Sequence, residues 1–297
     1  MIENRVGHFI MYFRKMIKFH DLKVKAVPQV LFVLLLAISF GIRIAARPIV
    51  IDYSIYLQQM ANTYSEIMSS QDLRDPSAML KIAQSLQESA VLQNLLSASL
   101  KIIGIFILQR ILLMLVSYFY LGAYLCDHES ENSSLSCYIG KYKKALTRFV
   151  GFNLIFYSAI IFILFAGLFI LSFAAVLVPV LILPIMLISY LLPAGWFILQ
   201  VIFIFKDITF LDTGVTIWRN FKLSTRLSAG NRLIIGVNIF FISFLNVMIG
   251  MFTVESQLIS MFIISFLEVI IILVRQRLVA LMYLSRTRRV IAPPAEG

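Results

Sequence analysis

The chain has 297 residues, of which 60% are hydrophobic and only 14% are charged, and its formal net charge is +11. A soluble domain usually carries about 25% charged residues, so this composition, with a mean hydropathy of +0.91, excludes an ordinary water-soluble protein. Because the basic residues flank apolar segments, we expect membrane lipids, and no nucleic acid, as partners.

Residues 1–25 form a basic segment that precedes the first apolar run. Aromatic and aliphatic side chains are interspersed there with Arg14, Lys15 and Lys18, a pattern typical of a helix that lies in a membrane interface. Anchoring and orientation suffice to explain such a helix. The sharper alternative is recognition of anionic lipid headgroups by these three cations.

The first two apolar runs predict two transmembrane helices. They cover Ala26 to Ile42 and Leu100 to Leu125, and about 20 apolar residues are needed to cross a bilayer core. The connection of residues 47–99 is long for a loop without secondary structure, and its apolar residues recur mostly at helical spacing around a helix start at Asp75-Pro76-Ser77. We expect an external helical hairpin that lies on the surface or extends the two spans, either packing on itself or serving as a cap or partner site.

The strongest membrane signal is the run of 57 residues between Arg148 and Lys206 that contains no charged side chain. Its length predicts a third span of about 149–174 and a fourth of about 176–205. The fourth is interrupted by three prolines, at Pro179, Pro184 and Pro193. Proline removes a helical hydrogen bond, so this span is either kinked by packing, bent back, or opened around a cavity.

Two further runs, Leu233–Val254 and Ser260–Leu284, complete six predicted spans. The sequence therefore predicts an all-α, polytopic transmembrane helix bundle that forms a single membrane domain over 1–297. The positive-inside rule places the basic loops 126–148 and 206–232, and both termini, in the cytoplasm of a cell at its plasma membrane. We expect amphipathic helices in these loops, the second from Asp212 to Ser228.

Catalytic and metal-binding patterns are missing from the sequence. It contains no H-E-x-x-H, G-x-S-x-G or Walker pattern. Cys126 and Cys137 lack companion histidines at metal-ligand spacing, and on a reducing side of the membrane we expect no disulfide between them. We therefore expect no enzyme, no catalytic residue, no metal and no cofactor.

Two ionisable residues inside the spans are the first candidates for a functional site. Arg110 and Glu268 are expected at comparable depth, where an unpaired charge is costly. They either form a structural ion pair, line a polar cavity, or do not meet. Other polar residues in the spans would extend a polar path; they are Gln109, Asn153, Asn238 and Asn246. Arg275 and Arg277, near the cytoplasmic end of the last span, are expected to reach lipid headgroups.

Both cytoplasmic loops lead into the membrane through a basic helix. The first covers Tyr138 to Val150, and the second ends in Gly230-Asn231-Arg232 before the fifth span. Over about residues 100–285 this arrangement resembles six-helix bacterial membrane proteins similar to the membrane domain of glycerophosphoryl diester phosphodiesterases and to the uncharacterised YciC-like proteins. No phosphodiesterase domain is recognisable, so that activity is not expected.

The resemblance implies a noncatalytic integral membrane protein in envelope or lipid handling, or a membrane partner of a transport complex. The alternative is a transporter, or the membrane subunit of an ATP-driven exporter, with a polar path near Arg110 and Glu268. An exporter subunit would contact its partner through the cytoplasmic loop helices. A partner at the external hairpin is the other option.

Overall fold

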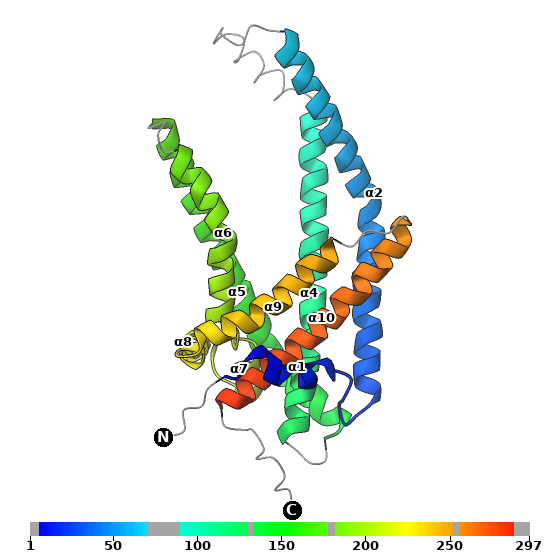
Figure 1. Cartoon of the computed structure of the whole chain (residues 1–297), viewed down its shortest axis with the longest axis vertical. Coiled ribbons are helices and arrows are strands. Elements are labelled where there is room, and N and C mark those ends of the chain that lie inside the picture. The colour runs from blue at the N-terminus through cyan, green and yellow to red at the C-terminus, as the bar shows by residue number, and fades with distance from the viewer. Residues whose placement is uncertain (1–5, 71–89, 130–132, 178–181, 252–255, 288–297) are drawn as a thin grey trace, which may run out of the picture. The chain divides into compact units, whose positions relative to one another are not determined.

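The computed structural model describes residues 6–70, 90–129, 133–177, 182–251 and 256–287 (Figure 1). For 63–64, 66–70, 165, 168–177 and 182–191 it describes the backbone only. Every regular element in these ranges is a helix, which confirms the all-α prediction. The helices are α1 (Phe9–Ile17), α2 (Ala26–Ser70), α4 (Ala90–Glu129), α5 (Leu135–Leu177), α6 (Ile182–Ile202), α7 (Ile208–Asp212), α8 (Ile217–Ser228), α9 (Arg232–Gly250) and α10 (Gln257–Arg286).

Five of these helices are long and apolar enough to cross a bilayer: α2, α4, α5, α9 and α10. The predicted fourth span corresponds to α6, a 21-residue apolar helix with Pro193 inside it. The protein is therefore a multi-pass membrane protein, with a span count close to the six expected from the sequence.

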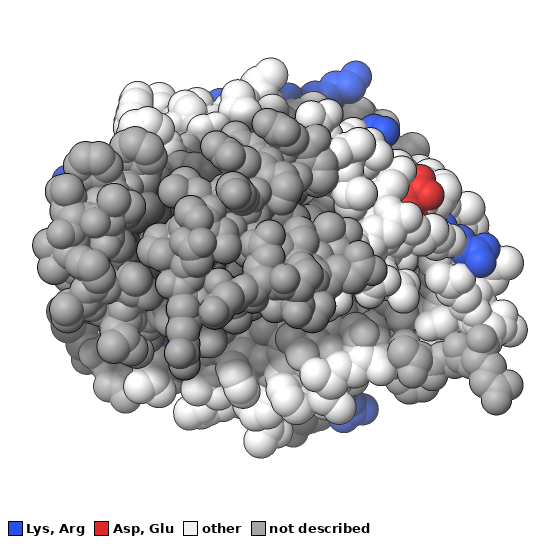
Figure 2. Space-filling view, turned by 90° about the horizontal axis from the view of Figure 1, so that it is seen from above, with Lys and Arg blue, Asp and Glu red and all other residues white. Residues whose placement is uncertain are grey.

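The surfaces of these helices are apolar where a soluble protein would be polar. Among the exposed side chains are Phe106 and Ile107 on α4, Phe162 on α5 and Phe244 on α9. In the space-filling view of Figure 2, charged side chains show only as small blue and red groups among white ones on the described surface. Exposure of this much apolar area is unfavourable in water, so lipid is the solvent of these faces.

The two halves of the expected external hairpin begin as continuations of the spans. α2 runs for 45 residues, about 67 Å at about 1.5 Å per residue, and so passes through Arg43, Arg47 and Pro48 without ending at Ile42. The two arginines do not end the helix, because their charges lie on the side chains and leave the backbone hydrogen bonds in place. The predicted helix start at Asp75-Pro76-Ser77 lies outside the described residues.

Contacts divide the chain into two compact units. Unit 1 comprises residues 1–32, 117–252 and 270–297, and unit 2 comprises residues 33–116 and 253–269. Unit 1 has an aromatic core in which Tyr118 stacks on Phe149, with ring centroids 3.7 Å apart, and Phe152 contacts Phe210 of α7. Unit 2 buries Leu35 and Val269 but also, unusually for a membrane core, several polar groups.

The loop of residues 206–232 folds as two helices, where the sequence predicts one from Asp212 to Ser228. The break lies at Gly214, whose φ of +62° favours glycine. The Arg148 side chain donates a hydrogen bond to the Gly214 carbonyl, and a Cβ at this position would lie 3.2 Å from the same guanidinium. This turn ends α7 and allows α8 to begin at Ile217.

Cys126 and Cys137 form a disulfide, which corrects the expectation of two separate thiols. Asp127 at the end of α4 accepts hydrogen bonds from Tyr138 and Ser133, so the end of α4 lies against the start of α5. The two Cα atoms are thereby 6.6 Å apart. A disulfide is typical of an oxidising compartment, whereas the basic loops favour the cytoplasm.

Thiol labelling of the full chain tests the disulfide. Denatured without reductant, the protein should take up no maleimide label, and after reduction it should take up two. Cys126→Ser should expose the remaining thiol without reductant and lower the free energy of unfolding by about 2–4 kcal/mol. Two labels on unreduced protein from native membranes would contradict the disulfide and agree with a reducing side.

Candidate functional site

Unit 2 contains a buried carboxylate held by residues of α2. Glu268 of α10 accepts a hydrogen bond from the Ser39 hydroxyl at 2.8 Å and an ion-paired hydrogen bond from Arg43 at 2.8 Å, both on Oε2. Gln109 of α4 lies 3.5 Å from the Ser39 hydroxyl. We call these four residues the Glu268 cluster. It is built from three helices that cross the membrane.

The expected partner of Glu268, Arg110, is also near it. The nearest atoms, Arg110 Nη1 and Glu268 Oε1, are 3.9 Å apart, and the Arg110 side chain is 71% exposed. Arg43 is closer and only 28% exposed. Arg43 is therefore the principal partner. The apolar run that ends at Ile42 does not predict this role, because it places Arg43 at the end of the first span. The signal was present in the four-residue spacing of Ser39, Arg43 and Arg47, which puts them on one helix face.

The remaining residues of the expected polar path lie in unit 1 and have separate partners. The Asn238 amide donates to the Gly7 carbonyl at 3.0 Å, and Asn153 donates to Asp207 at 3.1 Å. Asn246 is exposed on α9. Within unit 1 these three side chains are not joined by the hydrogen bonds of the described residues, so the polar path stays a prediction.

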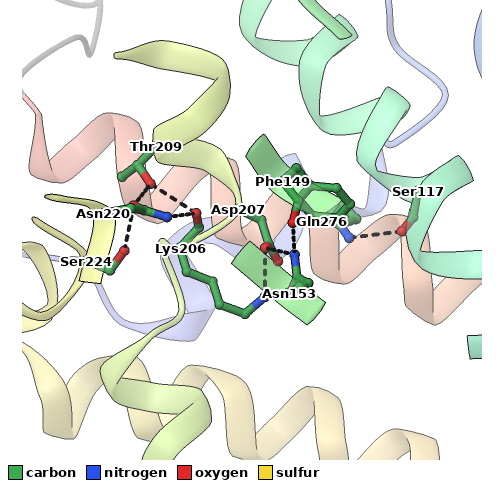
Figure 3. Close-up of polar contacts among 9 residues, drawn as sticks. All are labelled: Ser117, Phe149, Asn153, Lys206, Asp207, Thr209, Asn220, Ser224 and Gln276. Atoms are coloured by element: carbon green, nitrogen blue, oxygen red, sulfur yellow. Dashed lines mark hydrogen bonds and ion pairs between the residues drawn. The ribbon is translucent and has the colours of Figure 1, made fainter. Parts of the chain in front are cut away.

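A second polar cluster surrounds the Lys206 ammonium in unit 1 (Figure 3). Lys206 Nζ lies 2.7 Å from Asp207 Oδ1 and donates to the side-chain oxygen of Asn153. Three aromatic rings face it with centroids 5.6–5.9 Å away; they belong to Phe152, Phe156 and Tyr157. The charge that ends the uncharged run is thus buried and paired, and contributes cation–π contacts.

α8 is attached to this cluster by a polar face. Asn220 donates to the Lys206 carbonyl at 2.7 Å and accepts from Thr209, and Ser224 donates to Asn220 at 3.1 Å (Figure 3). Ser228 donates to the Ile202 carbonyl at 2.9 Å. Ser228 thus satisfies the carbonyl of the last residue of α6, and Asn220 satisfies the carbonyl of Lys206, which precedes α7. The opposite face of α8 exposes Trp218 and three basic residues, Arg219, Lys222 and Arg226.

An apolar groove of about 520 Å³ lies between the end of α6 and the start of α9. Phe197, Ile198 and Val201 line it from α6, and Gly236 and Phe240 line it from α9. Arg232, the first residue of α9, lies at its edge. No hydrogen bond or ion pair joins the Arg232 side chain to any residue that the structure describes.

The turn before α9 fixes the position of Arg232. Gly230 has a φ of +79°, and the buried Asn231 accepts a hydrogen bond from the Val6 amide at 3.1 Å. Arg286 of α10 donates to the Ala229 carbonyl at 3.1 Å. The Gly230-Asn231-Arg232 motif therefore joins the N-terminal segment to α9 and presents its arginine at the groove.

Another hollow of about 510 Å³ lies between α5 and the α7–α8 turn. Three cations line it: Lys141 pairs with Glu129, Arg148 donates to the Gly214 carbonyl, and Lys144 is exposed.

α1 has three faces. Tyr12 and Met16 are buried, and the Tyr12 hydroxyl lies 2.7 Å from that of Ser285. Next to this face runs an exposed apolar stripe, and beyond it a basic stripe. The apolar stripe comprises Ile10, Phe13 and Ile17, and the basic stripe Arg14, Lys15 and Lys18. One face of α1 thus packs against the protein, and the other two are apolar and basic. This arrangement is typical of a helix at a membrane interface.

The two arginines of α10 differ in their surroundings. Arg275 is exposed and donates to Gln200 at 3.1 Å. Arg277 is 7% exposed; it donates to the carbonyls of Lys18 and Asp21 and stacks over the Tyr124 ring. This placement corrects the expected headgroup role of Arg277, whose guanidinium instead holds the N-terminal segment.

In the described ranges no group of three or more His, Cys, Asp or Glu side chains could hold a metal ion. Searches of protein-family models, of curated proteins and of solved structures find no match to the chain. The resemblance to six-helix bacterial membrane proteins therefore stays a prediction, and the site must be interpreted from its own chemistry.

Proposed function

We propose that this protein is a noncatalytic membrane protein that binds an anionic lipid, with the acyl chain in the α6–α9 groove and the headgroup at Arg232. The main observation in support of this proposal is the apolar groove with Arg232 at its edge. In this arrangement both termini and the basic loops face the cytoplasm, and the role lies in lipid handling in the envelope.

Three properties of the groove support a lipid. Its described lining is apolar except for Arg232, and its volume falls in the range of about 300–1,000 Å³ that is common for small-molecule sites. The first backbone amides of α9 lack helical partners and favour an anion. The guanidinium of Arg232 beside them adds N–H donors whose arrangement matches the oxygens of a phosphate.

α1 adds a second lipid-facing surface in the same unit. Phe9 of α1 stacks on Phe241 of α9, with ring centroids 5.0 Å apart, so the apolar stripe of α1 continues onto the exposed face of α9. Its basic stripe would then lie at the level of the headgroups. A transport role would require a continuous polar path, and the separate partners of Asn153 and Asn238 give that alternative less support.

Lipid retained by the purified protein tests the groove. Native mass spectrometry after purification in a mild detergent should show bound phospholipid enriched in anionic headgroups. Arg232→Gln should reduce this enrichment about tenfold or more, because a charge-assisted hydrogen bond to phosphate is lost. Gly236→Leu should reduce the total bound lipid, since its side chain would occupy the groove.

Matched variants separate these effects from general damage. A Cβ at Gly236 would lie 3.7 Å from Val201, an ordinary contact, so Gly236→Ala should retain lipid. Lys143→Gln removes an exposed cation away from the groove lining and should preserve the headgroup preference. The proposal fails if Arg232→Gln and Lys143→Gln retain the same lipids as the wild type.

A further inference from the structure

Unit 2 contains more positive charge near Glu268 than this carboxylate neutralises. Arg43 and Arg110 both approach Glu268, while Arg47 lies one turn beyond Arg43 on the same face of α2. The described residues supply Arg47 with no ion pair. Two guanidinium groups thus share one carboxylate, and a third lies one helical turn away, within helices that cross the membrane.

Several donors on the two helices that hold Glu268 and Arg43 are buried and have no acceptor among the described residues. They are Nε of Arg43, Nε of Arg47 and the hydroxyl of Ser265. Ser265 is 0% exposed and lies one turn before Glu268 on α10. Buried donors are normally satisfied by an acceptor, so the cluster lacks negatively charged or accepting atoms.

The position of the cluster makes this imbalance costly. Glu268 lies about 16 Å along α10 from its start at Gln257, at about 1.5 Å per residue, which is well inside a core of about 30 Å. Uncompensated arginines at such depth are unfavourable, and those that occur usually mark ligand or ion sites. The exposed side chain of Arg110 is free to contribute to an added ligand.

We propose that Arg43, Arg47 and Arg110 bind a phosphate-type oxyanion next to Glu268. Guanidinium groups match the geometry of phosphate oxygens and form paired hydrogen bonds to them. Glu268 holds Arg43 in place, and the Ser265 hydroxyl provides a further donor. The oxyanion is either the headgroup of a membrane lipid or a free anion that enters from solvent. This site is distinct from the groove in unit 1.

Thermal unfolding of the full chain tests this site and distinguishes the two sources. In a neutral detergent at constant ionic strength, inorganic phosphate should raise the unfolding midpoint saturably if the site takes a free anion. If it takes a headgroup, inorganic phosphate should have little effect, and phosphatidylglycerol in phosphatidylcholine nanodiscs should raise the midpoint. The proposal is overturned if neither does.

Arg47→Gln should weaken the stabilising ligand about tenfold or more. Because Arg47 has no described partner, this variant should fold; Arg110→Gln serves as the second variant if it does not. Lys101→Gln, an exposed change on α4, should respond like the wild type. Arg232→Gln should keep the response to inorganic phosphate and the part of the phosphatidylglycerol response that Arg47→Gln removes. The failure of one site is thereby distinguishable from failure of the other. An unchanged response of both arginine variants in unit 2 would also overturn the site.

Discussion

Replacing Glu268 by alanine should destabilise unit 2 by about 3–5 kcal/mol, because removal of one partner leaves a buried charge uncompensated. The carboxylate accepts from both Ser39 and Arg43, so both donors lose their acceptor. Glu268→Gln should cost less, since its amide oxygen still accepts a hydrogen bond. The measurement is the free energy of unfolding of the full chain in mixed micelles.

Charge exchange identifies the partner. Combining Arg43→Glu with Glu268→Arg should recover part of the stability lost in either single variant. The same exchange with Arg110 should recover less, because Arg110 is 3.9 Å away and largely exposed, and exposed pairs contribute about 0–1 kcal/mol. Equal recovery in both exchanges would contradict the assignment of Arg43, and no recovery in either would contradict the ion pair itself.

The membrane helices were predictable because their signal is local. An apolar run of about 20 residues identifies a span without knowledge of its neighbours, so the sequence located α4, α5, α9 and α10 closely. The end of the first span was misplaced because Arg43 and Arg47 looked like a boundary. They are instead interior residues of α2, and Arg43 is paired with Glu268, 225 residues away.

Composition could not predict the contacts between segments that are distant in the sequence. The sequence marked Lys206 as the end of an uncharged run, yet the structure buries it against Asn153 and three rings. Likewise, the sequence shows the Gly-Asn-Arg turn only as a motif. Its contact with Val6 could not be predicted, because that contact depends on the fold of the N-terminal segment. The groove beside Arg232 arises from packing of α6 on α9 and has no single-helix signature.

Disruption of the Lys206 cluster should have the second large effect on stability. Asp207→Ala should destabilise unit 1 by about 3–5 kcal/mol, because the Lys206 ammonium, with a side chain only 11% exposed, then loses its carboxylate. Asn153 and the three rings remain, but a neutral oxygen and ring faces compensate a full charge incompletely. The free energy of unfolding and the loss of native tryptophan fluorescence report this change.

The double variant Lys206→Met with Asp207→Ala separates charge burial from loss of packing. It removes the ammonium together with its partner, and a buried ion pair replaced by apolar groups is often neutral or better. The Lys206 carbonyl, which accepts from Asn220 and Thr209, is unaffected by the side-chain change. The double variant should therefore be more stable than Asp207→Ala alone. If it is less stable, the cost of the single variant does not come from an uncompensated lysine, and the contacts of the Lys206 side chain with the three rings are what the double variant loses.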